Sequence, residues 1–263
     1  MELELAGKHV LVTGASKGIG LATVKAFLAE GATVTAASRR TTPELDATDA
    51  TFLSADLSTV DGPGQMVETV LANQPGLDVL VNNAGGGELR DGVLGNPFGG
   101  GDDVWEHTFA LNLYSALRAT RAALPALTEA RGAVVNVSSI STALPHTNPL
   151  PYSAAKAALN SYSRGLAEAV AGAGVRVNVV TPGTTRTNLV VGEDGFMAQV
   201  AAALGVEHAA LLADRNGQDG PITGELIDPA EIARVIVLLS SPTMPSAVGS
   251  NWALHAGSLK MPA

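Results

Sequence analysis

The chain has 263 residues, of which 46% are hydrophobic and 16% are charged, and it contains no cysteine. This composition excludes disulfide scaffolds, thiolate nucleophiles and cysteine zinc sites, and it opposes intrinsic disorder. The net charge of −9 opposes contact with polyanionic backbones, so we expect no nucleic-acid partner.

Short runs rich in valine and alanine alternate with longer amphipathic segments, a pattern typical of a parallel sheet with helices on both faces. In chain order we expect strands at residues 9–13, 33–38, 51–53, 79–82, 133–138 and 176–181, and near 252–255. The helices expected between them span residues 19–30, 65–73, 103–128, 152–171 and 229–239. One α/β unit often reaches about 250 residues, so we expect a single domain over residues 1–263.

Three segments interrupt this alternation. Residues 39–50 lack a long apolar period, so the crossover helix there is expected to be short or absent. Residues 85–101 are rich in glycine, which predicts a mobile loop. Residues 184–227 are longer than most structureless connections, and we expect a substrate lid with a small helix around residues 197–204.

The chain carries no sequence signal for a membrane or for export. Its first residues lack the basic and apolar regions of a signal peptide. The most apolar stretch, residues 232–239, is short and contains Arg234, whereas a spanning helix needs about 20 apolar residues. We therefore expect a cytoplasmic protein without a membrane segment.

A glycine-rich turn follows the first expected strand and opens a helix, with the sequence Thr13-Gly14-Ala15-Ser16-Lys17-Gly18-Ile19-Gly20. Glycines let a backbone approach a pyrophosphate, whose charge is stabilised by the free N–H groups of the helix. The spacing differs from Gly-x-Gly-x-x-Gly, and taken alone the turn is compatible with a purely structural role. A nucleotide-triphosphate loop is excluded, because no Gly-Lys-Ser/Thr follows it.

Tyr152 and Lys156 are four residues apart and so lie on one helical face. A lysine cation near a phenol lowers its pKa, which makes Tyr152 a candidate general acid/base. An isolated pair of this kind is more often a solvated helix face. Ser139 favours catalysis, because it ends a buried strand, where ligands bind in open α/β sheets.

Taken together, six features resemble the short-chain dehydrogenase/reductase family in order and spacing, from residue 7 to about residue 257: the glycine-rich turn, Asn82-Asn83-Ala84-Gly85, Asn112, Ser139, Tyr152-x-x-x-Lys156 and Pro182-Gly183. The resemblance implies an α/β fold with a Rossmann-type doubly wound parallel sheet of about seven strands and helices on both faces. It also implies an oxidoreductase that transfers a hydride between a nicotinamide and a carbonyl or secondary alcohol.

The resemblance assigns catalytic roles to four residues. Tyr152 exchanges a proton with the substrate oxygen, Ser139 hydrogen-bonds that oxygen, and Lys156 holds the nicotinamide ribose and tunes Tyr152. Asn112 anchors a proton-relay water, although a locally bonded helix residue is the alternative. Ser138 is expected to be structural, because neighbouring strand residues point to opposite sides.

The resemblance also implies cofactor contacts from separate stretches of the chain: Gly14, Ser16, Lys17, Gly18, Ile19, Gly20, Asp56, Leu57, Asn83, Ala84, Gly85, Tyr152, Lys156, Pro182, Gly183, Thr185 and Thr187. Two of them have a structural alternative. Asp56 could cap its own loop, and Asn83 could lock its turn.

The end of the second strand predicts NADP(H) rather than NAD(H). An NAD site usually carries an acid there, whereas this chain has Ser38 followed by Arg39 and Arg40. The arginine fork suits a phosphate, and Lys17 adds a second cation. The alternative is that the two arginines form a solvated basic turn.

The expected substrate pocket, lined by residues 89–91, 140–150 and 184–227, carries few charges, which favours an uncharged or apolar carbonyl or alcohol. His146, Glu193, Asp194, Asp214 and Asp219 read as solvated, and no metal-ligand spacing is present. The family resemblance implies a homotetramer or homodimer, although residues 255–257 read His-Ala-Gly where many relatives have Asp-Gly-Gly. A non-catalytic NADP(H)-binding sensor is the second functional hypothesis.

Overall fold

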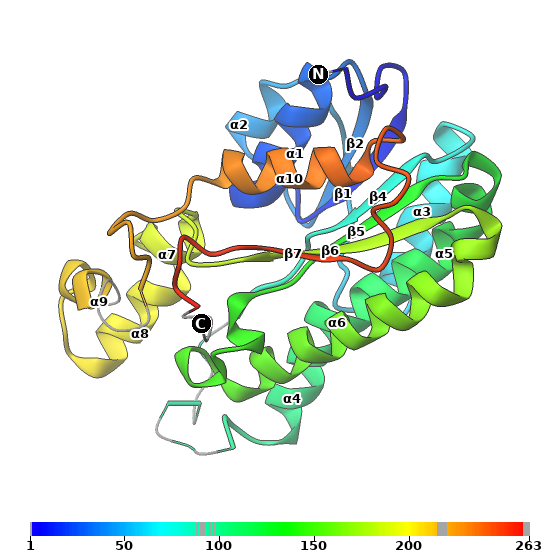
Figure 1. The fold of residues 1–263 in the computed structure, drawn as a ribbon. Helices are drawn as coiled ribbons and strands as arrows, with labels where there is room; N and C mark the ends of the chain where they lie inside the picture. Colours follow the sequence, from blue (N-terminus) through cyan, green and yellow to red (C-terminus); the bar gives the residue numbers. More distant parts are fainter. Residues whose placement is uncertain are drawn as a thin grey trace.

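The fold is a seven-stranded sheet with the strand order β3-β2-β1-β4-β5-β6-β7, seen in a computed structural model that describes residues 2–87, 89, 93–94, 96, 98–214 and 220–259. All neighbouring strands are parallel, which confirms the predicted doubly wound sheet (Figure 1). The strands are β1 (His9–Thr13), β2 (Thr33–Ser38), β3 (Thr51–Ser54), β4 (Val79–Asn82), β5 (Ala133–Val137), β6 (Arg176–Pro182) and β7 (Asn251–Leu254).

The central strands are buried on both faces, which explains their continuous valine-rich sequences. One apolar core lies between the sheet and helices α1 (Gly18–Ala29) and α10 (Pro229–Ser240). The other lies beneath α3 (Gly62–Asn73), α5 (Ser115–Ala130) and α6 (Leu150–Val170). Figure 1 shows these two helical layers on opposite sides of the sheet.

Helix boundaries follow the apolar periods and the capping residues. Asp228 begins α10 with a capping box: its carboxylate accepts from Ala230 N at 2.8 Å, and Glu231 accepts from Asp228 N at 3.2 Å. The crossover after β2 contains only the four-residue α2 (Pro43–Asp46), as predicted.

The expected helix over residues 103–128 is present, but it contains a π-helical turn. It comprises α4 (Asp102–Phe109), a π-helical turn at Ala110–Tyr114 and then α5. Apolar periodicity did not reveal this turn, because one wider turn barely changes the spacing of the buried positions.

Residues 184–227 contain three short helices, α7 (Asn188–Val191), α8 (Phe196–Leu204) and α9 (His208–Asp214). Helix α8 confirms the small helix expected around residues 197–204, whereas α7 and α9 were not predicted. Phe196, Met197 and Val200 of α8 form an apolar cluster of their own, separate from the two cores. Within 85–101, residues 88, 90–92, 95 and 97 lie outside the described part of the chain, as do residues 215–219, which include Asp219.

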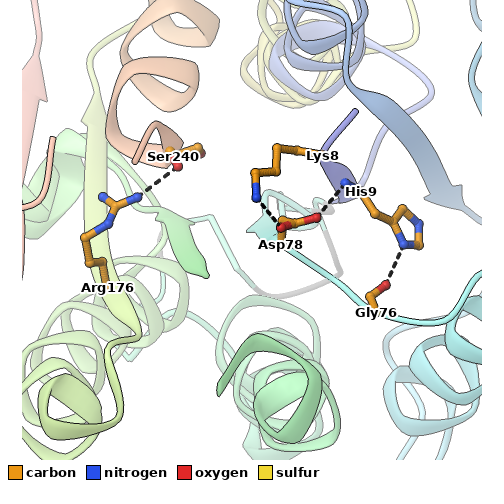
Figure 2. Close-up of polar contacts among 6 residues, drawn as sticks. All are labelled: Lys8, His9, Gly76, Asp78, Arg176 and Ser240. Atoms are coloured by element: carbon orange, nitrogen blue, oxygen red, sulfur yellow. Dashed lines mark hydrogen bonds and ion pairs between the residues drawn. The ribbon is translucent and has the colours of Figure 1, made fainter. Parts of the chain in front are cut away.

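Polar side chains fasten the amino ends of the strands, as Figure 2 shows. The Arg176 guanidinium donates to Ser240 O at 2.9 Å, at the end of α10. Asp78 binds Lys8 Nζ at 2.9 Å and accepts from His9 N at 2.9 Å, and His9 Nδ1 lies 2.7 Å from Gly76 O. These contacts lie at the amino ends of β1, β4 and β6, so the carboxyl ends of the strands remain available for a site.

Within the described residues, no helix is both long and apolar enough to span a bilayer.

Candidate active site

A cavity of about 800 Å³ opens at the carboxyl ends of the strands, where the strand order reverses between β1 and β4. Ligands bind at such switch points in open α/β sheets. The predicted site residues that line the cavity are Gly14, Ser16, Lys17, Gly18, Ile19, Ser38, Arg39, Arg40, Asp56, Leu57, Asn83, Ala84, Gly85, Ser139, Tyr152, Lys156, Pro182, Gly183, Thr185 and Thr187. Gly20 and Asn112 lie behind its wall instead.

The glycine-rich turn requires glycine for two different reasons. Gly14 and Gly18 have backbone φ values of +63° and +57°, which residues with a side chain rarely adopt. Gly20 has an ordinary φ, but a Cβ atom there would lie 2.2 Å from Gly14 O. Gly20 therefore allows α1 to pack against the turn and makes no wall of the cavity.

Asn83 locks the turn that follows β4. Its side-chain amide donates to Thr13 O at 2.9 Å and to Gly14 O at 3.2 Å. The Thr13 hydroxyl accepts from the backbone N–H groups of Asn83 and Ala84, each at 3.0 Å. The two strand-end turns that line the cavity are thus joined to each other.

Ser139, Tyr152 and Lys156 meet at one end of the cavity. Tyr152 is hydrogen-bonded to the Ser139 hydroxyl, and Lys156 Nζ lies 5.9 Å from the centre of the Tyr152 ring. The Lys156 side chain is 3% exposed, and its Nζ donates to Val137 O at 2.8 Å. The first turns of α6 therefore carry a phenol and an amine to the end of β5.

Burial shifts the pKa values of Tyr152 and Lys156 in opposite directions. It raises the pKa of Tyr152, although the hydrogen bond to Ser139 acts in the other direction. It lowers the pKa of Lys156 to about 8. The expectation that Lys156 lowers the Tyr152 pKa is therefore not met here, because burial of the phenol is the larger effect. At neutral pH Tyr152 is protonated, and most of the Lys156 amine is still a cation.

Asn112 holds the chain that follows β4. Its side chain, in the π-helical turn, is 1% exposed. Its Oδ1 accepts from Gly86 N, and its Nδ2 donates to Gly86 O and Thr108 O, each at 3.0 Å. Both amide hydrogens are thus used within the protein, one toward Thr108 on the same helix and one toward Gly86 after β4.

Ser138 differs from the sequence-based expectation. Strand β5 ends at Val137, so Ser138 lies past the regular alternation and lines the cavity beside Ser139. It is buried, and its hydroxyl has no hydrogen-bond partner within the described chain. Alternation along a strand cannot place a residue beyond the strand's last pair.

The other end of the cavity is basic. Lys17, Arg39 and Arg40 line it with exposed side chains, and Ser38 stands where an acid would repel a phosphate. The Asp56 carboxylate accepts from the Ser58 hydroxyl at 2.7 Å and from Ser58 N at 3.0 Å. These bonds are the main reason why the pKa of Asp56 is lowered, so Asp56 caps its loop while it lines the cavity.

Several lining residues were not predicted individually. Asn148, Asn188, Leu189 and Val190 fall within the segments expected to form the substrate pocket. Thr41, Thr42, Ala55, Ser58, His107 and Leu111 were missed. The position of Thr41 and Thr42 directly after the arginine pair was the available signal. His146 is exposed and does not line this cavity, and within the described chain no His, Asp and Glu cluster could hold a metal.

Comparisons with known proteins agree with this geometry. The family model for short chain dehydrogenases matches residues 8–195. The uncharacterized oxidoreductase YvrD of Bacillus subtilis (strain 168) is 34% identical over 99% of both chains. The 3-oxoacyl-(acyl-carrier-protein) reductase FabG of Vibrio harveyi is 31% identical over 97% of this chain and 98% of its own. L-Sorbose reductase from Gluconobacter frateurii, solved with NADPH and L-sorbose, is 27% identical and superposes with a TM-score of 0.86 over the whole of both chains.

Proposed function

Because this chain belongs to the short-chain dehydrogenase family of oxidoreductases, we propose that it is an NADP(H)-dependent enzyme that interconverts a carbonyl group and a secondary alcohol. The proposal rests on one observation: a single cavity holds a candidate catalytic group and a basic group at its two ends. A phenol, a hydroxyl and an amine lie at one end, and three basic side chains lie at the other.

Tyr152 is the proposed general acid for carbonyl reduction. Its raised pKa keeps the phenol protonated at neutral pH, the form that donates a proton to the substrate oxygen. The Ser139 hydroxyl, already bonded to Tyr152, binds the same oxygen as negative charge develops on it. The Lys156 cation then stabilises the phenolate, and in the oxidation direction that phenolate takes the proton from the alcohol.

The residues present fit a bound dinucleotide phosphate. Gly14 and Gly18 carry no side chain where the turn enters α1, which leaves the backbone open to a pyrophosphate. Lys17, Arg39 and Arg40 would hold the 2′-phosphate, and the lack of an acid at Ser38 favours NADP(H) over NAD(H). When bound, the nicotinamide supplies or accepts the hydride.

The remaining contacts divide between the two ends of the cofactor. We assign Asp56 and Leu57 to the adenine side, and Asn83, Ala84 and Gly85 to the adjoining ribose. We assign Pro182, Gly183, Thr185 and Thr187 to the nicotinamide carboxamide. The L-sorbose reductase solved with NADPH supports this choice of cofactor.

The proposed substrate is an uncharged carbonyl or alcohol. Ile140, Leu189 and Val190 provide an apolar wall near the reactive end, and Asn148 and Asn188 add neutral polar groups. Such a wall accepts a neutral ligand more readily than a polyanion. The L-sorbose complex makes a neutral sugar one member of this class to test, and the reductase from Vibrio harveyi makes a 3-oxoacyl thioester another.

We further propose that residues 1–263 act as one domain, in a cytoplasmic homotetramer or homodimer. All the described strands belong to one sheet, which supports a single domain. Sedimentation equilibrium of the purified chain would measure the subunit number.

The catalytic proposal is tested with Tyr152→Phe. NADPH oxidation is followed with L-sorbose, a 3-oxoacyl thioester and a simple aliphatic ketone. Loss of the proton donor should lower kcat by about 10²- to 10⁴-fold, while the NADPH dissociation constant changes less than about twofold. Unchanged turnover would refute the role of Tyr152. A wild-type protein that binds NADPH but reduces no member of a broad carbonyl panel would favour the sensor hypothesis.

The cofactor proposal is tested with Arg39→Ala. Losing one charge-assisted hydrogen bond should weaken NADPH binding by about 1.5–3 kcal/mol and leave NADH binding unchanged. Arg234→Ala is the matched control, because Arg234 is an exposed arginine on α10 that does not line the cavity. Tighter binding of NADH than NADPH by the wild-type protein would refute the NADP(H) preference.

A further inference from the structure

Hydroxyl groups fasten the segment that carries the two arginines. The Ser38 hydroxyl donates to Arg40 O at 2.7 Å, and the Ser54 hydroxyl donates to Arg39 O at 3.2 Å. Both bonds hold the backbone of the arginine segment to the ends of its own strand pair, β2 and β3. The hydrogen of the Ser38 hydroxyl is thereby used within the protein, so this hydroxyl does not donate to a phosphate.

Thr42 makes a different connection. Its hydroxyl donates to Ser16 O at 2.8 Å and accepts from Leu45 N at 3.3 Å, in the first turn of α2. Ser16 directly precedes Lys17 in the glycine-rich turn. One half-buried hydroxyl therefore joins the turn that carries the lysine to the segment that carries the arginines, across the wall of the same cavity.

We propose that Thr42 is a positioning residue that sets the preference for NADP(H) over NAD(H), an inference that rests on the proposed function. A 2′-phosphate bound between Lys17 and the arginines needs both backbone segments at a fixed separation. The three cationic side chains are exposed, so packing does not fix them, and the order at this end of the cavity comes from the hydrogen bonds that hold their backbone. NADH has a ribose 2′-hydroxyl in place of the phosphate, so its binding depends less on the separation of the two backbone segments.

Two carboxylates near this segment are anchored by hydrogen bonds, and one of them, Asp56, also attracts Arg39 as an anion. Asp46 accepts a hydrogen bond from the Thr41 hydroxyl, and Asp56 accepts from Ser58. Both acids are held by neutral donors on their own loops.

The test compares Thr42→Val, which removes the hydroxyl but keeps the shape, with Thr42→Ser, which keeps the hydroxyl. Dissociation constants for NADPH and NADH are measured by fluorescence titration, with melting temperatures in parallel. Thr48→Val is the matched control, because the Thr48 hydroxyl donates to Leu45 O at 2.7 Å at the other end of α2. It perturbs the same helix without touching the glycine-rich turn.

Thr42→Val should raise the NADPH dissociation constant about five- to tenfold, the size expected for one hydrogen bond, and change that for NADH less than about twofold. Thr42→Ser and Thr48→Val should both remain within about twofold of the wild type for both cofactors. Thr42→Ala carries the same expectation and replaces Thr42→Val if the valine variant does not fold.

Equal weakening of both cofactors would overturn the inference, because the hydroxyl would then serve only the pyrophosphate turn. So would unchanged NADPH binding in Thr42→Val beside a wild type that prefers NADPH. A wild type without any NADPH preference would instead refute the proposed cofactor itself, and with it the role of Thr42. Measuring Arg39→Ala in the same titrations separates these failures.

Discussion

Replacing Lys156 with methionine should remove a pH dependence from the stability of the cofactor-free protein. Burial lowers the pKa of this amine from its ordinary 10.5 to about 8. Each pKa unit corresponds to about 1.4 kcal/mol, so keeping the amine charged in the fold costs about 3 kcal/mol. The side chain is 3% exposed, so solvent does little to reduce that cost.

The direction of the effect follows from proton counting. Between pH 8 and pH 10.5 the unfolded chain keeps the lysine proton while the folded chain loses it, so stability rises with pH in this window. Below pH 8 both states are charged, and the cost is present in full. From pH 7 to pH 9 the wild type should therefore gain about 1 kcal/mol relative to Lys156→Met.

Urea unfolding at one protein concentration, at half-unit steps from pH 7 to pH 9, measures this difference. Titrations elsewhere in the chain cancel between the two proteins. The range ends at pH 9 because the raised pKa of Tyr152 makes stability fall with pH above about 10. Lys25→Met, at an exposed position on α1, should show a constant difference from the wild type. A constant difference for Lys156→Met as well would refute the burial argument.

Two further predictions concern the scaffold. At Gly165, in α6, an added Cβ would meet open space, so Gly165→Ala should raise the free energy of unfolding by about 0.5–1 kcal/mol in urea unfolding. At Gly20 an added Cβ would meet Gly14 O, so Gly20→Ala should lower the melting temperature and weaken cofactor binding. Arg176→Met leaves the carbonyls of Leu239 and Ser240 without their buried donor and should lower the free energy of unfolding by about 2–4 kcal/mol, whereas Arg234→Met on the exposed face of α10 should change it by less than about 0.5 kcal/mol.

The strands and the order of the site segments could be predicted because their signals are local. A buried parallel strand has a valine-rich sequence that can be recognised directly. In the turn at residues 13–20, the glycines indicate where the backbone adopts a positive φ. Tyr152 and Lys156 share a face because a helix places residues four apart together. These inferences needed no knowledge of distant contacts.

What could not be predicted depends on partners far away in the sequence. Asn112 binds Gly86, which is 26 residues away, and the π-helical turn that carries Asn112 leaves almost no periodic signal. The raised pKa of Tyr152 reflects burial by several segments, whereas the sequence showed only its lysine neighbour. Thr42 bonds to Ser16 across 26 residues, and a threonine beside two arginines does not reveal its acceptor.

The two ends of the cavity should respond differently to substitution. At the reactive end, Lys156 and the residues that fasten it are buried, so changing them alters stability and chemistry together. At the basic end, the side chains of Lys17, Arg39 and Arg40 are exposed, and only their backbone is held in place, by hydrogen bonds from nearby hydroxyl groups. Side chains at the basic end can therefore be exchanged with little change in stability, and the cofactor preference can change there while the reactive end stays intact.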